Sequence, residues 1–252
     1  MFNFQCNYRK SIFSFALLPV IVTSGGISSV NLTNLQYISP SNQLLLAQNR
    51  PAFRISSLWQ RRKKPNTVRS GPSDICAIAP GVVDTYIVWH DRPLFLWQSF
   101  NKNQSVELIV RELETKKEVW KQTVNIADQK ALYSAQESLE PGKAYEWKLG
   151  TTSWRIFQLM SPQEHQKIAT QLQAIDQNLK ATKALPEEIA AKKAEYFLDY
   201  QVQHKTETGT FNPWSDALQS LYEVDKPSPS FIQERQELIT NLCNPPSKTV
   251  GG

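Results

Sequence analysis

Six short runs of β-branched and aromatic residues follow one another in the middle of the chain, separated by polar, Pro or Gly clusters. They lie at 82–89, 94–99, 106–113, 118–126, 144–149 and 154–159. Runs of this length and composition, bounded by turn-forming residues, predict β-strands. Because no helical pattern interrupts them, we expect residues 80–160 to form one β-sheet domain.

Apolar and polar residues alternate within several of these runs. Tyr145, Trp147 and Leu149 share one face of an extended chain, while Glu146 and Lys148 point to the other. One buried and one solvated face is typical of an antiparallel sheet. The number of strands therefore predicts a small antiparallel β-sandwich of the immunoglobulin or fibronectin type III kind. Residues 141–147 (PGKAYEW) resemble the P-G-x-x-Y-x-W phrase of such domains.

The C-terminal third of the chain has a helical pattern instead. Ser161, Pro162 and Glu164 form a helix-start signal, with a capping box and Pro at the first helical position. Apolar stripes at helical spacing then follow. The stripes are Ile168, Leu172, Ile175 and Leu179; Ala190, Ala194, Phe197 and Leu198; Trp214, Leu218, Leu221 and Tyr222; and Ile232, Ile239 and Leu242. We expect residues 161–243 to form an array of helical hairpins, which gives a mixed β then α fold class.

Arrays of helical hairpins mainly bind other polypeptides. We expect the binding groove of this one to lie around Phe197, Trp214, Leu218 and Tyr222. If so, Trp214→Ala weakens capture of a partner and leaves the β-domain folded.

The N-terminus has the order of an export signal. Arg9 and Lys10 precede an apolar run of 12 residues at 11–22, and small residues follow at 24–26. Twelve residues are too few for the roughly 20 that cross a bilayer as a helix. Residues 1–47 are therefore expected to be a signal peptide and leader, cleaved near Gly25 or Gly26, or after Ala47. The chain is then exported, to the periplasm or to the outer face of a membrane.

A polar, irregular segment at 48–79 is expected to be a flexible arm, and residues 244–252 a disordered tail. The arm contains a cluster of basic residues, which are Arg61, Arg62, Lys63, Lys64 and Arg69. Such a cluster binds an acidic polymer or an anionic lipid surface, or is a solvated tether. The whole chain has 28 Lys and Arg against 23 Asp and Glu, a net charge of +5, which is too small for a dedicated nucleic-acid binder.

Three cysteines occur, and export would remove Cys6 with the leader. Cys76 and Cys243 then remain in an oxidising compartment, either as a disulfide or as two unrelated thiols. A bridge between residues 167 positions apart would stabilise the fold by about 4–5 kcal/mol in the loop-entropy model. There is no C-x-x-C pair, and the histidines are scattered, so no metal site is expected.

Sequence motifs of common enzyme classes are absent. The chain has no G-x-S-x-G elbow, no phosphate-binding glycine loop and no H-E-x-x-H. His90 with Asp91, and Glu187 with Glu188, are the acid–base candidates, but the first pair falls at a predicted turn and the second in a first helical turn. We therefore expect a non-enzymatic protein with no cofactor.

Five tryptophans fall in the predicted β-domain. Trp120 and Trp147 lie on the same side of their predicted strands as the apolar residues and are expected in the core. Trp89 and Trp154 are the candidates for an exposed platform that stacks on sugar rings. A glycan or cell-wall binding module is thus the alternative to a protein-binding adaptor.

The order of these parts resembles the exported cyanobacterial proteins catalogued only as a domain of unknown function. The resemblance covers roughly positions 60–240 and depends on short phrases in a fixed order. These phrases lie at 76–80, 92–97, 141–147 and 214–222. The resemblance implies a location in the cell envelope and no known activity, and it supplies no catalytic residues. A partner would be an envelope protein, a wall polymer or an anionic lipid surface.

Overall fold

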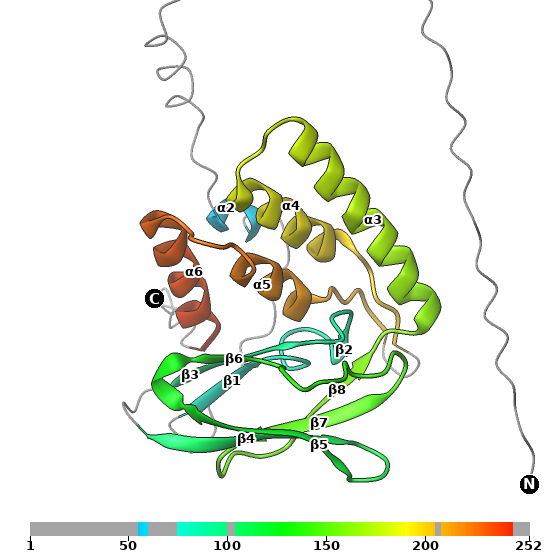
Figure 1. Cartoon of the computed structure of the whole chain (residues 1–252), viewed down its shortest axis with the longest axis vertical. Helices are drawn as coiled ribbons and strands as arrows, with labels where there is room; N and C mark the ends of the chain where they lie inside the picture. The colour runs from blue at the N-terminus through cyan, green and yellow to red at the C-terminus, as the bar shows by residue number, and fades with distance from the viewer. Residues whose placement is uncertain (1–54, 60–74, 100–103, 205–207, 244–252) are drawn as a thin grey trace, which may run out of the picture. The chain divides into compact units, whose positions relative to one another are not determined.

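The strand-forming runs build two β-sheets that are followed by four helices, so the mixed β then α layout is confirmed (Figure 1). The computed structural model describes residues 55–59, 75–99, 104–204 and 208–243. The predicted leader at 1–47, the basic cluster at 61–69 and the tail at 244–252 lie outside these residues.

The described strands are divided between a three-stranded sheet and a five-stranded sheet. The first has the order β1-β3-β6, with β1 Ile75–Ala79, β3 Leu94–Ser99 and β6 Lys130–Leu132. The second has the order β2-β8-β7-β4-β5, with β2 Ile87–Val88, β8 Arg155–Leu159, β7 Ala144–Leu149, β4 Ser105–Glu112 and β5 Glu118–Asn125. Neighbouring strands are antiparallel except β2 and β8, which run parallel. The prediction of wholly antiparallel pairing is therefore wrong at this edge.

The two sheets pack face to face through one apolar cluster, the sheet core. It includes Phe95 and Trp97 of β3, Trp120 of β5, Trp147 of β7 and Phe157 of β8. The predicted burial of Trp120 and Trp147 is confirmed, with exposed fractions of 8% and 0%. Large aromatic side chains supply much of the area that holds two sheets together.

The other face of the three-stranded sheet is covered by the helices. Leu94 and Leu96 alternate with Phe95 and Trp97 along β3, and their side chains belong to a second apolar cluster, the helix–sheet core. All four residues are buried because this strand has a neighbouring layer on each face. The described chain thus has three layers, which are the five-stranded sheet, the three-stranded sheet and the helices (Figure 1).

The helices are α2 Ile55–Trp59, α3 Pro162–Ala181, α4 Pro186–Asp199, α5 Trp214–Tyr222 and α6 Pro229–Cys243, with a 3-10 turn η1 at Ile126–Asp128. Ser161 caps α3 as predicted, since its Oγ accepts the backbone N–H of Glu164. The stripe predicted for α6 is wrong at Ile232, which is 45% exposed. Phe231, 3% exposed, takes its place in the helix–sheet core.

Packing contacts cross the predicted boundaries at 79/80 and 160/161. Strand β1 and helix α2 lie inside the segment expected to be an arm, and both contribute buried residues to the helix–sheet core. That core joins Ile78 of β1 and Leu94 of β3 to Ile168 of α3 and Trp214 of α5. Because strands and helices share these contacts, sheets and helices stabilise one another.

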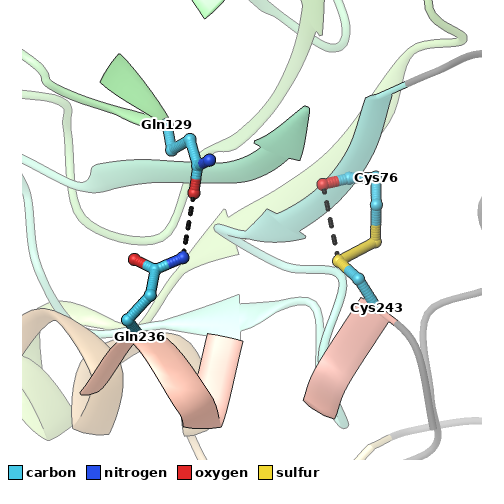
Figure 2. The surroundings of a disulfide bond; sticks show 4 residues. All are labelled: Cys76, Gln129, Gln236 and Cys243. Atoms are coloured by element: carbon cyan, nitrogen blue, oxygen red, sulfur yellow. Dashed lines mark hydrogen bonds between the residues drawn. A yellow bond between two sulfur atoms is a disulfide. The ribbon is translucent and has the colours of Figure 1, made fainter. Parts of the chain in front are cut away.

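A disulfide links the first strand of the three-stranded sheet to the last helix. Cys76 in β1 and Cys243 at the end of α6 are bonded, with their Cα atoms 6.1 Å apart (Figure 2). Gln236 of α6 also donates a hydrogen bond from Nε2 to Oε1 of Gln129, 3.3 Å away (Figure 2). These contacts hold α6 against the sheet that it covers.

Candidate functional site

Helix α5 carries four buried polar side chains, three of which contact the chain segment that leads from β1 into β3. Its apolar positions, among them Trp214, Leu218 and Leu221, face the helix–sheet core. The residues between them are polar and yet at most 7% exposed, namely Ser215, Asp216, Gln219 and Ser220. Buried polar groups are stable only when hydrogen-bonded, so the partners of these four side chains define the site.

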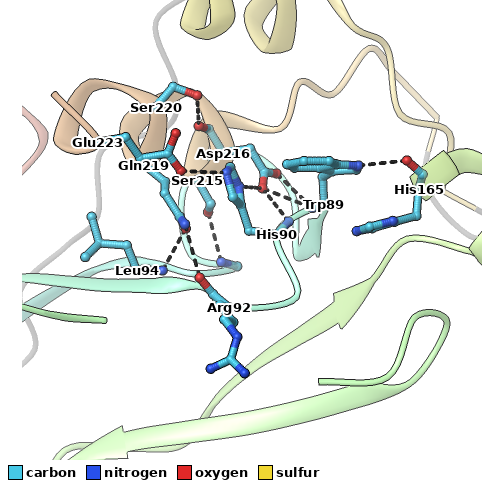
Figure 3. A network of polar contacts seen from close by, with 11 residues as sticks. Trp89, His90, Arg92, Leu94, His165, Ser215, Asp216, Gln219, Ser220 and Glu223 are labelled. Atoms are coloured by element: carbon cyan, nitrogen blue, oxygen red, sulfur yellow. Dashed lines mark hydrogen bonds and ion pairs between the residues drawn. The ribbon is translucent and has the colours of Figure 1, made fainter. Parts of the chain in front are cut away.

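Gln219 extends the hydrogen bonding of the three-stranded sheet. Its Oε1 accepts the backbone N–H of Leu94 at 2.7 Å, and its Nε2 donates to the backbone carbonyl of Arg92 at 3.1 Å (Figure 3). One side-chain amide thereby meets the first N–H of β3 and a carbonyl of the segment just before it, as a neighbouring strand would. Ser215 meets a further backbone group, because its Oγ accepts the N–H of Gly81 at 3.0 Å.

Asp216 is the centre of the network. Its carboxylate, 1% exposed, accepts the backbone N–H groups of Trp89 and His90 at 3.0 Å and Nδ1–H of His90 at 2.7 Å (Figure 3). Several charge-assisted hydrogen bonds offset the desolvation of this buried carboxylate. They also fix the turn between β2 and β3 against α5.

His90 is held between two carboxylates. Its Nδ1 contacts Asp216 and its Nε2 lies 3.2 Å from Oε1 of Glu223. Burial alone lowers the pKa of His90, but hydrogen bonds and charges from Asp216 and Glu223 outweigh it and raise the pKa from 6.5 to about 9. Near neutral pH the ring is an imidazolium with both N–H groups engaged. It therefore lacks the lone pair that a general base or a metal ligand needs.

Two hollows open on either side of His90 and Glu223. The first, which we call the edge hollow, has a volume of about 540 Å³ and lies between β6 and the C-terminal half of α5. Leu94, Leu132 and Tyr222 give it apolar walls. Leu132 is 52% exposed, and the Tyr222 ring lies 4.0 Å from the guanidinium carbon of Arg235.

The second hollow, of about 500 Å³, lies against helices α3 and α4. Its walls carry Asp176 together with Lys180 and Lys193, and both lysines form ion pairs with this carboxylate. Charges in this hollow are thus matched internally. The edge hollow is the more apolar of the two, and its lining includes the exposed apolar side chain of Leu132.

The predicted binding groove on the helices is wrong for three of its four residues. Phe197, Trp214 and Leu218 are 1%, 3% and 0% exposed, and all lie in the helix–sheet core. Periodicity identified the apolar face correctly, but the three-stranded sheet and the other helices cover it. Tyr222 alone is half-buried and reaches a surface, where it lines the edge hollow.

The two tryptophans predicted as sugar platforms differ in their surroundings. Trp89 is half-buried, stacks on the His165 ring at 5.0 Å and donates its indole N–H to the His165 carbonyl, so it is not an exposed platform (Figure 3). Trp154 is also half-buried, and its ring lies 3.8 Å from the guanidinium carbon of Arg111 and 4.9 Å from Nζ of Lys148. Cations therefore occupy positions next to this ring.

Charged residues noted in the sequence have structural partners. Glu188 accepts the backbone N–H of Leu185 at 3.0 Å, and Glu187 accepts that of Ser228. Glu146, predicted on the solvated face, is only 5% exposed because Arg111 and Lys116 pair with it. The carboxylates that contact His90 are Asp216 and Glu223, not the adjacent Asp91.

Sequence reasoning missed Asp216, Gln219 and the short strand β6. The signal for the first two was the cluster of polar residues between apolar positions in the helix at 214–222. Nothing in the periodicity pointed to β6, because Lys130–Leu132 is too short to show an alternation.

Comparison of the chain with protein-family models, curated proteins and solved structures finds no match. Within the described ranges, no group of three or more His, Cys, Asp or Glu residues is arranged to hold a metal ion. None of the described helices combines the length and apolar character that a membrane span requires.

Proposed function

We propose that this chain is a non-enzymatic adaptor of the cell envelope that binds another protein at the edge hollow. The observation that carries the proposal is the half-exposed Leu132 beside Tyr222, in a hollow next to the outer strand of a sheet. Apolar walls with a few polar groups at the rim are typical of binding sites. The two packed sheets would act as an immunoglobulin-like scaffold that keeps this surface rigid.

Two features support a binding role over a catalytic one. Both ring nitrogens of His90 and the Asp216 carboxylate are engaged with groups of the protein itself. The histidine is also charged near neutral pH, which makes it a poor general base. The network is better suited to holding the rim of the hollow in place than to proton transfer.

Export rests on the order of basic, apolar and small residues at 1–26 and on the envelope proteins that the chain resembles. The disulfide between Cys76 and Cys243 supports this location, because such bonds persist in oxidising compartments. The protein would then work in the periplasm or at the outer face of a membrane.

Site-specific photo-crosslinking tests the proposal. A photoreactive residue replaces Leu132 in the full chain, and the matched control replaces Ile232, which is similarly exposed at 45% on α6. We expect one discrete protein adduct from position 132 in intact cells and none from position 232. Equal labelling at both positions, or none at either, would contradict an adaptor role for the edge hollow.

A glycan or wall-polymer module is the second candidate, and the cations around Trp154 favour an anionic polymer. Lys148 lies near this ring and has no ion pair within the described part of the chain. The test is retention of the protein on purified wall polymer. Trp154→Ala should abolish retention if this module operates, whereas Leu132→Ala should not change it.

A further inference from the structure

We propose that the partner contributes an extended, acidic polypeptide segment, which adds to β6 as a new strand and places an apolar side chain in the edge hollow. This inference rests on the proposed adaptor function and specifies the chemistry of its partner. It combines three properties of one surface, which are a free strand edge, an apolar hollow beside it and unmatched positive charge at its rim.

The free edge follows from the pairing of β6 with β3. β6 is an edge strand of the three-stranded sheet, with β3 as its one neighbour in that sheet. Trp97 donates its N–H to the Gln129 carbonyl at 3.1 Å, and Tyr133 donates to the Pro93 carbonyl at 3.0 Å. Because backbone groups alternate in direction along a strand, those of Lys130 and Leu132 point away from β3. Among the residues that the structure describes, no backbone hydrogen bond to these outward groups is found.

The register also sets where a partner's side chains would lie. Leu132 is paired with Leu94, and Lys130 with Leu96, so all four side chains share the face that the helices cover. In an added strand, the residue opposite Leu132 points to this same face, about 5 Å away. It would cover the exposed part of Leu132 and enter the hollow against Tyr222. Strand addition with alternate side chains in pockets is a common mode of peptide recognition.

Charge at the rim selects an acidic partner. Arg92 and Lys130 line the hollow and Arg235 lies over Tyr222, and no carboxylate pairs with any of them within the described ranges. Glu223, by contrast, already contacts His90. Asp91 is the one other acidic side chain in the lining, so positive charge is in excess. Two copies of this chain joined edge to edge would bring these cations together, which disfavours self-association through β6.

A pair of substitutions at one position separates strand addition from simple side-chain contact. Leu132→Ala removes the side chain and keeps the outward N–H, whereas Leu132→Pro removes both. Proline is tolerated at an edge position whose N–H points outward, so the pairing with β3 is retained in both variants. Matching circular dichroism spectra and melting temperatures would establish that both variants are folded.

The probe is a synthetic peptide of about seven residues in which glutamate alternates with valine, with a lysine–valine peptide as its charge control. Fluorescence anisotropy with the full chain should detect the acidic peptide and not the basic one. Leu132→Pro should bind about fivefold more weakly than Leu132→Ala, since one backbone hydrogen bond is lost. Lys130→Glu should weaken binding by a similar factor. Amide exchange at Lys130 and Leu132 should slow when the peptide is bound.

Three results would overturn the inference: equal affinity of the Pro and Ala variants, equal binding of the basic peptide, or unchanged amide exchange at saturating peptide. If position 132 still crosslinks to a protein in cells, the adaptor function stands and only the mode of binding is refuted. If that crosslink is also absent, the proposed function fails with it. A concentration-dependent dimer abolished by Leu132→Pro would identify a second copy as the occupant and would likewise overturn the inference.

Discussion

Replacement of Asp216 by alanine tests whether the buried network stabilises the fold. The carboxylate accepts the backbone N–H groups of Trp89 and His90 and the Nδ1–H of the His90 imidazolium. Each buried donor left without an acceptor costs about 1–3 kcal/mol, and loss of one partner of a buried ion pair costs about 3–5 kcal/mol. Because Glu223 still contacts His90, we expect Asp216→Ala to lower the free energy of unfolding by about 3–5 kcal/mol.

The assay is equilibrium urea unfolding of the full chain, followed by tryptophan fluorescence with the disulfide intact. For a chain of this size, this loss of unfolding free energy lowers the urea concentration at the unfolding midpoint by about 2 M. Asp176→Ala is the matched control, because its carboxylate pairs with Lys180 and Lys193 at a more exposed site, and it should cost less than about 1 kcal/mol.

The isosteric variant Asp216→Asn separates charge from shape. It keeps one acceptor oxygen for the backbone N–H groups and removes one of the two carboxylate charges that stabilise protonated His90. An NMR titration should then show the pKa of His90 falling from about 9 toward 6.5. The network has no stabilising role if Asp216→Ala costs no more free energy of unfolding than Asp176→Ala, or if the pKa of His90 is unchanged in the Asn variant.

Three further predictions concern pH, the disulfide and the core. The pKa of His90 is raised from 6.5 to about 9, so protonated His90 contributes about 3 kcal/mol to the free energy of unfolding. This contribution is fully present below pH 6.5 and is lost as pH rises through 9. Urea unfolding at several pH values from 6 to 10 should show this loss of stability in the wild type and not in His90→Gln. Replacing both Cys76 and Cys243 by serine should lower the free energy of unfolding by up to about 4–5 kcal/mol, measured by the same urea titration. Trp214→Ala should destabilise the fold by about 3–5 kcal/mol, as expected for a buried core residue; a variant as stable as wild type would place Trp214 at the surface instead.

The sequence predictions are accurate where a helix or strand depends on neighbouring residues alone, and less accurate where distant contacts hold the segment. Strands β3 and β7 have the bounds expected from their alternation and their flanking turn residues. Helix α3 begins where Ser161 and Pro162 predict, because capping involves neighbouring residues only. The run at 82–89 forms only the two-residue strand β2, since the segment before it is held by turns and by Ser215.

The candidate site could not be found in the same way, because its contacts join distant residues. Gln219 and Leu94 are 125 positions apart, and Asp216 and His90 are 126 apart. Periodicity places these polar residues off the apolar stripe of α5, but it does not say whether water or protein faces them. The burial of Asp216 follows only from the packing of α5 against the segment between β1 and β3.

Local sequence signals account for the bounds of β3 and β7, the start of α3 and the apolar side of most described elements, because hydrophobic spacing and capping act over a few positions. What covers each apolar side depends on contacts between distant elements. The tertiary structure placed Phe197, Trp214 and Leu218 in an interior shared with the three-stranded sheet and left Leu132 and Tyr222 at a surface. Whether an apolar side chain becomes core or binding surface depends on which distant element packs against it, and local spacing carries no information about that choice.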